Sequence, residues 1–321
     1  MKMLFLPLFI LAEFYLTGRL IELLAGEKER RRVKQDIFKN AGTACLKGML
    51  ACFFLWELLY AAGSFTKLSL GTISRIFAVM LAIITLASVF LSYRKREGKI
   101  WLSDSEFSNT FIPAIILFFI QIIFVTMNGA VLTGSDFTDS SSYILKSFYD
   151  GRSLPALKYH DGYSAFVAFL ALMTDLGVQE ILGIVMPPVM ITLEYMVCIL
   201  WVCLISDGNP RVRGLVMQLP FIANVSGALA GGGLFYDLLF KGYEPENLIF
   251  AVLVPLLIFG FCDVPKEKLI LSGIYGVFFP VAGFFASGKS GLAIMVFQMI
   301  CCLLVTGGRR IKKLFSGRGQ S

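Results

Sequence analysis

The chain has 321 residues, of which 57% are hydrophobic and only 16% are charged, and its formal net charge at pH 7 is +7. Soluble domains usually carry about 25% charged residues, so the composition excludes a soluble domain and indicates an integral membrane protein. The basic residues lie in short clusters between apolar segments, which is typical of membrane orientation signals and not of a nucleic-acid-binding surface. The seven cysteines lie in or beside apolar segments, which argues against a disulfide framework or a zinc site.

Apolar segments that reach or approach the roughly 18 to 20 residues needed to cross a bilayer predict an all-α membrane protein of about nine spans. The predicted spans are 3–24, 42–62, 69–92, 109–131, 181–205, 214–239, 247–263, 269–287 and 291–307. We divide the chain into an N-terminal transmembrane region of three spans, 1–108, and a second transmembrane region, 109–321, which contains a long polar loop at 132–180.

Lysine and arginine are distributed unequally between alternate connections. Nineteen of the 29 lie in one set of connections and in the C-terminal tail, whereas seven lie in the other set. Because basic connections stay in the cytoplasm, the N-terminus is predicted to lie outside the cell membrane and the C-terminus inside. The same rule places the loop 132–180 outside, provided that 164–176 does not cross the bilayer.

The polar loop is predicted to contain two short helices near the membrane surface, joined by 151–161. Thr138, Asp139 or Ser140 is a suitable N-cap for the first helix, which is expected to end near Tyr149. The apolar part of 164–176 has only about 11 residues, too few to span, and is expected to form an interfacial or re-entrant helix.

Ionisable side chains are concentrated in this loop, and long loops often carry function. Asp136 and Asp139 are candidate general bases or metal ligands, and helix caps in the alternative. His160, the only histidine, is either a proton shuttle beside Asp161 or an exposed loop residue. Arg152 is a candidate partner for a lipid phosphate.

Three further candidates lie beyond the loop. Glu194 lies near the middle of the span 181–205, where an ionisable side chain is either functional or hydrogen-bonded to a neighbouring span. Asp237 and Lys241 lie in the next predicted outer turn, after the glycines at 231–233. These glycines either break the span so that both side chains face the loop carboxylates, or they allow close helix packing.

The segment from Gly283 to Ser290 matches the phosphate-loop pattern G-x-x-x-x-G-K-[ST]. A nucleotide site of this type needs a buried strand before the loop and a helix after it. Here the pattern follows a predicted span and lies outside the membrane, so we reject it as a nucleotide site. Lys289, with the free N–H groups at the start of the last span, is instead expected to hold a lipid phosphate.

The layout of residues 109–265 resembles a known group of membrane enzymes. A span followed by an external loop with an early aspartate, two surface helices and further spans is similar to the GT-C superfamily of membrane glycosyltransferases. SDFTDSSSYILKSFYDG (135–151) resembles the aspartate loop of an uncharacterised multi-span family of Gram-positive bacteria. FKGYEPENLIFAVLVPLLIF (240–259) resembles the Gly-Lys turn and proline-containing span of that family. The resemblance implies that Asp136 or Asp139 is the catalytic base, and that outer basic residues bind the phosphate of a polyprenyl-phosphate sugar.

Three functions are therefore considered. In a GT-C-like transferase, Asp136 or Asp139 deprotonates an acceptor hydroxyl, and Lys241, Lys289 or Arg152 neutralises the lipid phosphate. In a transporter or flippase, Glu194 and Asp237 line a path through the bilayer. The third hypothesis is a non-catalytic membrane scaffold. We expect the lipid bilayer as a partner and neither a nucleic acid nor a nucleotide; no cofactor is indicated, although a divalent cation is compatible with the aspartates.

Overall fold

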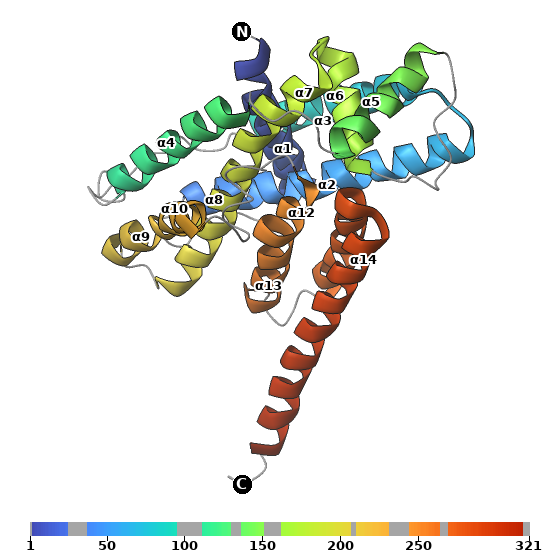
Figure 1. Ribbon diagram of the computed structural model, residues 1–321. Coiled ribbons are helices and arrows are strands. Elements are labelled where there is room, and N and C mark those ends of the chain that lie inside the picture. Colours follow the sequence, from blue (N-terminus) through green and yellow to red (C-terminus); the bar gives the residue numbers. More distant parts are fainter. Residues whose placement is uncertain are drawn as a thin grey trace.

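The structure is a computed structural model that describes residues 2–24, 37–94, 111–129, 136–150, 162–206, 210–230, 244–263 and 269–316. All regular elements within these ranges are helices, as the composition predicts (Figure 1). The α-helices are α1 (Lys2–Leu24), α2 (Ile37–Phe65), α3 (Leu70–Arg94), α4 (Phe111–Gly129), α5 (Asp136–Tyr149), α6 (Gly162–Thr174), α7 (Val178–Glu180), α8 (Met186–Ile205), α9 (Pro210–Val216), α10 (Leu219–Ala230), α12 (Pro245–Asn247), α13 (Val254–Asp263) and α14 (Leu269–Ser316). Two π-helical segments, η2 (Ile181–Val185) and η3 (Leu248–Leu253), continue α7 into α8 and α12 into α13.

Five helical segments in the described part of the chain are long and apolar enough to cross a membrane. They are Lys39–Phe65, Leu70–Arg94, Val178–Ile205, Pro245–Cys262 and Gly276–Leu304. This result confirms the all-α membrane class. A helix is present within each of the nine predicted spans, but the number of spans stays a prediction.

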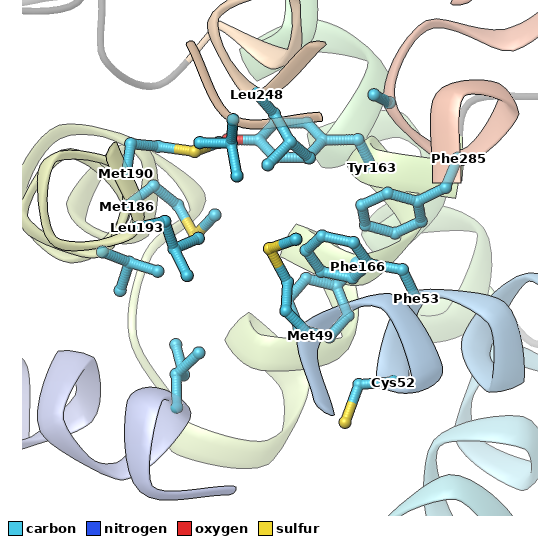
Figure 2. Packing of buried hydrophobic residues seen from close by; sticks show 14 of the residues in the cluster. Met49, Cys52, Phe53, Tyr163, Phe166, Met186, Met190, Leu193, Leu248 and Phe285 are labelled. Carbon is cyan, nitrogen blue, oxygen red and sulfur yellow. The ribbon is translucent and has the colours of Figure 1, made fainter. Parts of the chain in front are cut away.

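Helix α2 lies at the centre of the fold and packs against α1, α3, α6, α8 and α14. Its inward side chains belong to one continuous buried cluster. Figure 2 shows Met49 and Phe53 of α2 beside Phe166 of α6 and Phe285 of α14. The rings of Phe53 and Phe285 are stacked, with centroids 4.2 Å apart. The hydrophobic effect does not drive helices together in lipid, so their association depends on close packing. Contacts between aromatic rings strengthen this packing.

Small residues bring α1 and α2 into backbone contact. A side chain at Gly18 would collide with the carbonyl group of Ala44, and one at Gly48 would collide with the carbonyl oxygen of Phe14. Ala44 and Gly48 are four residues apart, so they form a small-x-x-x-small pattern on one face of α2. This pattern allows the two helices to approach more closely than larger side chains would permit.

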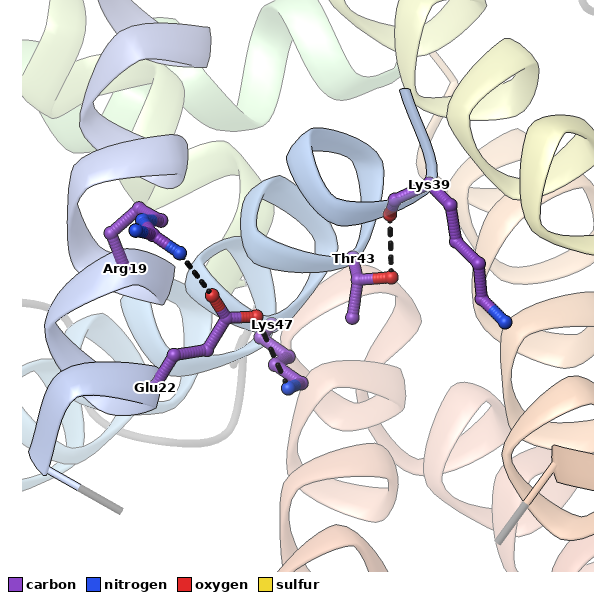
Figure 3. Close-up of polar contacts among 5 residues, drawn as sticks. All are labelled: Arg19, Glu22, Lys39, Thr43 and Lys47. Atoms are coloured by element: carbon purple, nitrogen blue, oxygen red, sulfur yellow. Dashed lines mark hydrogen bonds and ion pairs between the residues drawn. The ribbon is translucent and has the colours of Figure 1, made fainter. Parts of the chain in front are cut away.

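A shared ion pair joins the same two helices and explains two basic residues within the predicted spans. Arg19 donates to Glu22 Oε2 at 3.1 Å, and Lys47 Nζ donates to Glu22 Oε1 at 3.3 Å (Figure 3). Their side chains are only 20%, 14% and 16% exposed for Arg19, Glu22 and Lys47. A carboxylate held between two cations tolerates this partial burial, whereas an isolated charge would not.

Helix α14 consists of two antiparallel arms joined by a turn. Ser287 (φ −140°, ψ 32°) and Gly288 (φ 55°, ψ −134°) leave the helical conformation. A side chain at Gly283 would collide with the backbone of Gly291, and one at Gly276 would lie 3.8 Å from Met299 Sδ. In a straight helix these pairs would be about 12 Å and 35 Å apart, so the arms must run side by side. The arms coincide with the separate spans predicted at 269–287 and 291–307.

Helix α6 forms where the sequence predicts a short helix that does not span the bilayer, but it is deeply buried. All ten residues from Gly162 to Ala171 are buried, and α6 packs against α2, α3, α5 and α14. A helix lying at the membrane interface would keep one polar face in contact with headgroups and water. The packing therefore favours the re-entrant alternative for α6 over the interfacial one.

The π-helical segments lie next to prolines. Pro187 and Pro188 follow η2, and Pro255 follows η3 after one residue. Proline has no N–H and its ring crowds the preceding carbonyl groups, so an α-helical turn cannot be completed there. A widened π turn accommodates this conflict, and such turns are frequent at functional sites. Hydrophobic periodicity did not predict either segment.

We expect Gly48→Ala to destabilise the protein by about 1–3 kcal/mol, because the new methyl group would push α1 away from α2. Gly260→Ala is the matched control, since a methyl group at Gly260 meets nothing within 4 Å. Both variants gain the same helix propensity, so the difference in their unfolding in detergent reports the helix contact. Equal stability of the two variants would contradict the close packing of α1 on α2.

Candidate functional site

Helix α5 is the first element of the polar loop that the structure describes. It runs from Asp136 to Tyr149, so Asp136 and Asp139 both lie in its first turn. This confirms the predicted helix and its end, although the helix begins two residues before the earliest predicted cap. Negative charge in a first turn interacts favourably with the helix dipole, so both aspartates suit this position structurally as well.

One side of α5 packs against the protein. Ser141, Ile144 and Ser147 are buried and recur every three residues along this side. The Ser147 hydroxyl donates to the carbonyl oxygen of Ile144 at 2.7 Å, which satisfies it inside the packed face. The helix is therefore fixed in rotation, and its opposite side faces outward.

The exposed side of α5 forms one wall of an open groove of about 690 Å³. The lining residues are Ser142, Leu145, Lys146, Tyr149, Gly177, Val178, Gln179 and Glu180. The backbone N–H of Gly177 donates to Glu180 Oε2 at 2.8 Å, so this carboxylate caps the helix that continues into α8. Lys146 is the only basic residue among those that line the groove. The lining is mainly apolar, and a cation, a hydroxyl group, an amide and a tyrosine ring are among its groups.

The loop ends where α6 enters the core at Gly162. The indole Nε1 of Trp56 donates to the carbonyl oxygen of Gly162 at 3.1 Å. A side chain at Gly162 would collide with the Glu57 carboxylate and lie 3.2 Å from Phe285. A side chain at this position, which directly follows His160 and Asp161 in the sequence, would require the Glu57 carboxylate to move.

Aromatic rings hold α6 in place after this entry point. Phe169 contacts Trp56 and Phe77, with ring centroids 5.0 Å and 5.3 Å away, and these two rings also contact each other at 5.1 Å. Phe166 contacts Phe285 of α14 edge-on at 5.9 Å. Rings from α2, α3 and α14 thus surround one short helix, which gives the end of the polar loop a rigid attachment.

Glu57 is a buried acidic residue that the sequence analysis did not single out. It is 5% exposed, and its carboxylate lies against Gly162 at the end of the polar loop. The signal that identified Glu194, an ionisable residue inside an apolar span, applies equally to Glu57 within 42–62.

Lys289 is exposed at the turn of α14, next to α6. Phe285, one helical turn earlier in the chain, contacts Tyr163 with ring centroids 6.1 Å apart. The hydroxyl groups of Ser287 and Ser290 are hydrogen-bonded at 3.0 Å across the turn. The phosphate-loop pattern therefore lies in a helix–turn–helix and has no strand before it.

Glu194 belongs to a separate set of polar contacts. It is 4% exposed, and its Oε2 accepts a hydrogen bond from Asn224 Nδ2 of α10 at 3.1 Å. The next residue, Tyr195, donates to Gln121 Oε1 of α4 at 2.6 Å. Two consecutive residues of α8 therefore bind two different helices. The hydrogen bond to a neighbouring span was one of the two explanations that the sequence offered for Glu194.

Four of the predicted site residues, Arg152, His160, Asp237 and Lys241, lie outside the described residues, as do the side chains of Asp136 and Asp139. The structure brings the first turn of α5 and the Lys289 turn onto elements that both pack against α6. Within the part of the chain that the structure describes, no three histidine, cysteine, aspartate or glutamate side chains are placed to hold a metal ion.

Comparisons of the chain with protein-family models, with curated proteins and with solved structures give no match. The resemblance to the GT-C superfamily therefore stays a prediction.

Proposed function

We propose that the protein is a GT-C-like membrane glycosyltransferase that uses a polyprenyl-phosphate sugar at the outer face of the cell membrane. The observation that carries this proposal is the packing of both α5 and the α14 arms against the buried helix α6. Helix α5 contains Asp136 and Asp139 in its first turn, and α14 exposes Lys289 where its two arms meet. The candidate base and the candidate phosphate-binding cation therefore lie on two helices, α5 and α14, that both pack against α6.

The proposed reaction assigns one task to each group. An aspartate of α5 takes the proton of the acceptor hydroxyl, whose oxygen then forms a bond to the anomeric carbon of the sugar. The bond from that carbon to the phosphate oxygen breaks, and polyprenyl phosphate leaves with the bonding electrons. Lys289, Lys241 and Arg152 neutralise the charge that develops on this phosphate, while His160 and Asp237 bind the substrates.

The proposal includes the membrane arrangement of nine spans with the N-terminus outside and the C-terminus in the cytoplasm. Its support is the position of the chain ends: α1 begins at the end of the molecule where α5, α6 and α7 gather, and α14 ends at the opposite end (Figure 1). The basic C-terminal tail would then lie in the cytoplasm, as the distribution of charge requires.

Helical spacing favours Asp139 over Asp136 as the base. Asp139, Ser142, Lys146 and Tyr149 are separated by three, four and three residues, which keeps these positions near one side of α5. The last three line the groove. Asp136 lies six positions before Ser142, which turns it about 120° away. The groove and Asp139 therefore suit one bound substrate.

We expect Asp139→Asn to lower the transfer rate by about 100-fold or more, because asparagine cannot accept the proton. Asp136→Asn should lower it less, and Asp150→Asn, at the far end of the same loop helix, should leave it unchanged. The measurement is sugar transfer from a panel of polyprenyl-phosphate sugars by the purified protein in nanodiscs. Equal activity of Asp139→Asn and Asp150→Asn would refute a catalytic role for Asp139.

The orientation is tested with single cysteines in a cysteine-free background. Ser142, Lys289 and Arg94 are all exposed. We expect cysteines at Ser142 and Lys289 to react with a membrane-impermeant thiol reagent on intact cells, and a cysteine at Arg94 to react only after the cells are opened. The reverse pattern would overturn the proposed orientation.

A transporter or flippase is the second candidate. Two proline-associated π segments lie in spans that both begin on the proposed outer side, and interrupted spans in corresponding positions are typical of transporter binding sites. Substrate movement that survives Asp139→Asn would favour this candidate over the transferase. Absence of both transfer and transport in the wild-type protein would favour the scaffold hypothesis.

A further inference from the structure

The strongest unexplained feature is a buried acid in the middle of the transmembrane helices. Glu194 is the only charged residue of α8, and α4 and α10, which pack against α8, carry none. The other helices packed against α8 carry Lys2, Glu13, Arg19, Glu22, Lys39, Lys47, Glu57, Arg211, Arg213 and Asp263. The nearest ionisable groups along α8 are Tyr195, which binds Gln121, and Cys198.

The ion pairs found among the described residues do not compensate Glu194. Both use Glu22, which binds Arg19 and Lys47. The hydrogen bond that Glu194 receives comes from the neutral amide of Asn224. An ionised carboxylate at this depth without a cation would carry a large solvation cost, so a proton or a cation must neutralise it.

The second observation concerns the side-chain oxygen of Asn224. The residue is fully buried, and its Oδ1 has no hydrogen-bond donor among the residues that the structure describes. Leaving a buried acceptor without a donor destabilises the folded state. Exchanging the oxygen and nitrogen of the amide does not remove the problem, since the oxygen would then face the Glu194 carboxylate, which has no proton to donate.

We propose that Glu194 and Asn224 form an intramembrane proton-binding site, in which Glu194 is a neutral carboxylic acid. The acid O–H donates to Asn224 Oδ1 while the Asn224 amide donates to the other carboxyl oxygen. A single proton thus removes the buried charge and supplies the missing donor. The pair joins α8 to α10, and it does not depend on whether the outer loop is a transferase.

The test is infrared spectroscopy of the full-length protein in lipid nanodiscs at neutral pH. A protonated carboxyl group has a carbonyl stretch that is separate from the bands of carboxylates. We expect this band in the wild type, its loss in Glu194→Gln and its displacement in Asn224→Leu, which removes the hydrogen bond. Glu57→Gln is the matched control, because Glu57 is also a buried acid in a span, and it should leave the Glu194 band in place.

A chemical probe gives a second measurement on the unmodified protein. Lipophilic carbodiimides react with protonated carboxyl groups in apolar surroundings, so mass spectrometry should find the label on Glu194 and not on Glu22, which forms ion pairs with Arg19 and Lys47. Increasing sodium or potassium chloride should not protect Glu194. Protection by either salt would overturn the proposal in favour of a cation site, and absence of both label and band would show an ionised, hydrated carboxylate.

Discussion

Close packing around α2 is the constraint on which the remaining helices depend. In lipid there is no hydrophobic force between helices, so their association relies on small residues, fitted rings and polar contacts. Gly48 lets α1 touch the backbone of α2, Gly42 lies against Met196 of α8, and Phe53 stacks on Phe285 of α14. Gly42 and Phe53 are eleven residues apart and so lie on one side of α2, whereas Gly48 lies on another side. A displacement of α2 would therefore disturb α1, α8 and α14 together, and α14 also packs against α6 of the polar loop.

Polar groups within the apolar helices follow a second constraint, since the bilayer offers no water to satisfy them. Glu22 is held between Arg19 and Lys47, and Glu13 of α1 accepts a hydrogen bond from the hydroxyl of Thr85 of α3 at 2.8 Å. These contacts bind α1 to α2 and α3. Glu194 differs from Glu22 because its partner is a neutral amide. Glu22 is thus compensated by two cations, whereas the hydrogen bond to Glu194 brings no positive charge.

The polar loop combines a partly exposed helix, α5, with a buried attachment, α6. α5 presents one side to the groove and packs its other side inward, while α6 is enclosed by aromatic rings from three helices. Trp56 and Glu57 of α2 meet the chain at Gly162, where the loop enters the core. Sites are most precise when loops are held by rigid elements, so this attachment suits a loop that positions catalytic groups.

The sequence by itself determined the membrane class, the positions of most helices and the two arms of α14, because apolar length and interruptions by Gly, Lys and Pro are local signals. It also predicted the helix α5 and its end near Tyr149, and it singled out Glu194, an isolated acid in an apolar run. Only the tertiary structure decided that α6 is buried, that Glu57 lies beneath Gly162 and that Asn224 is the partner of Glu194. The physical reason is that these contacts join residues 30 to 105 positions apart, whereas hydrophobic periodicity reports only the environment of each helix and not which neighbour it meets.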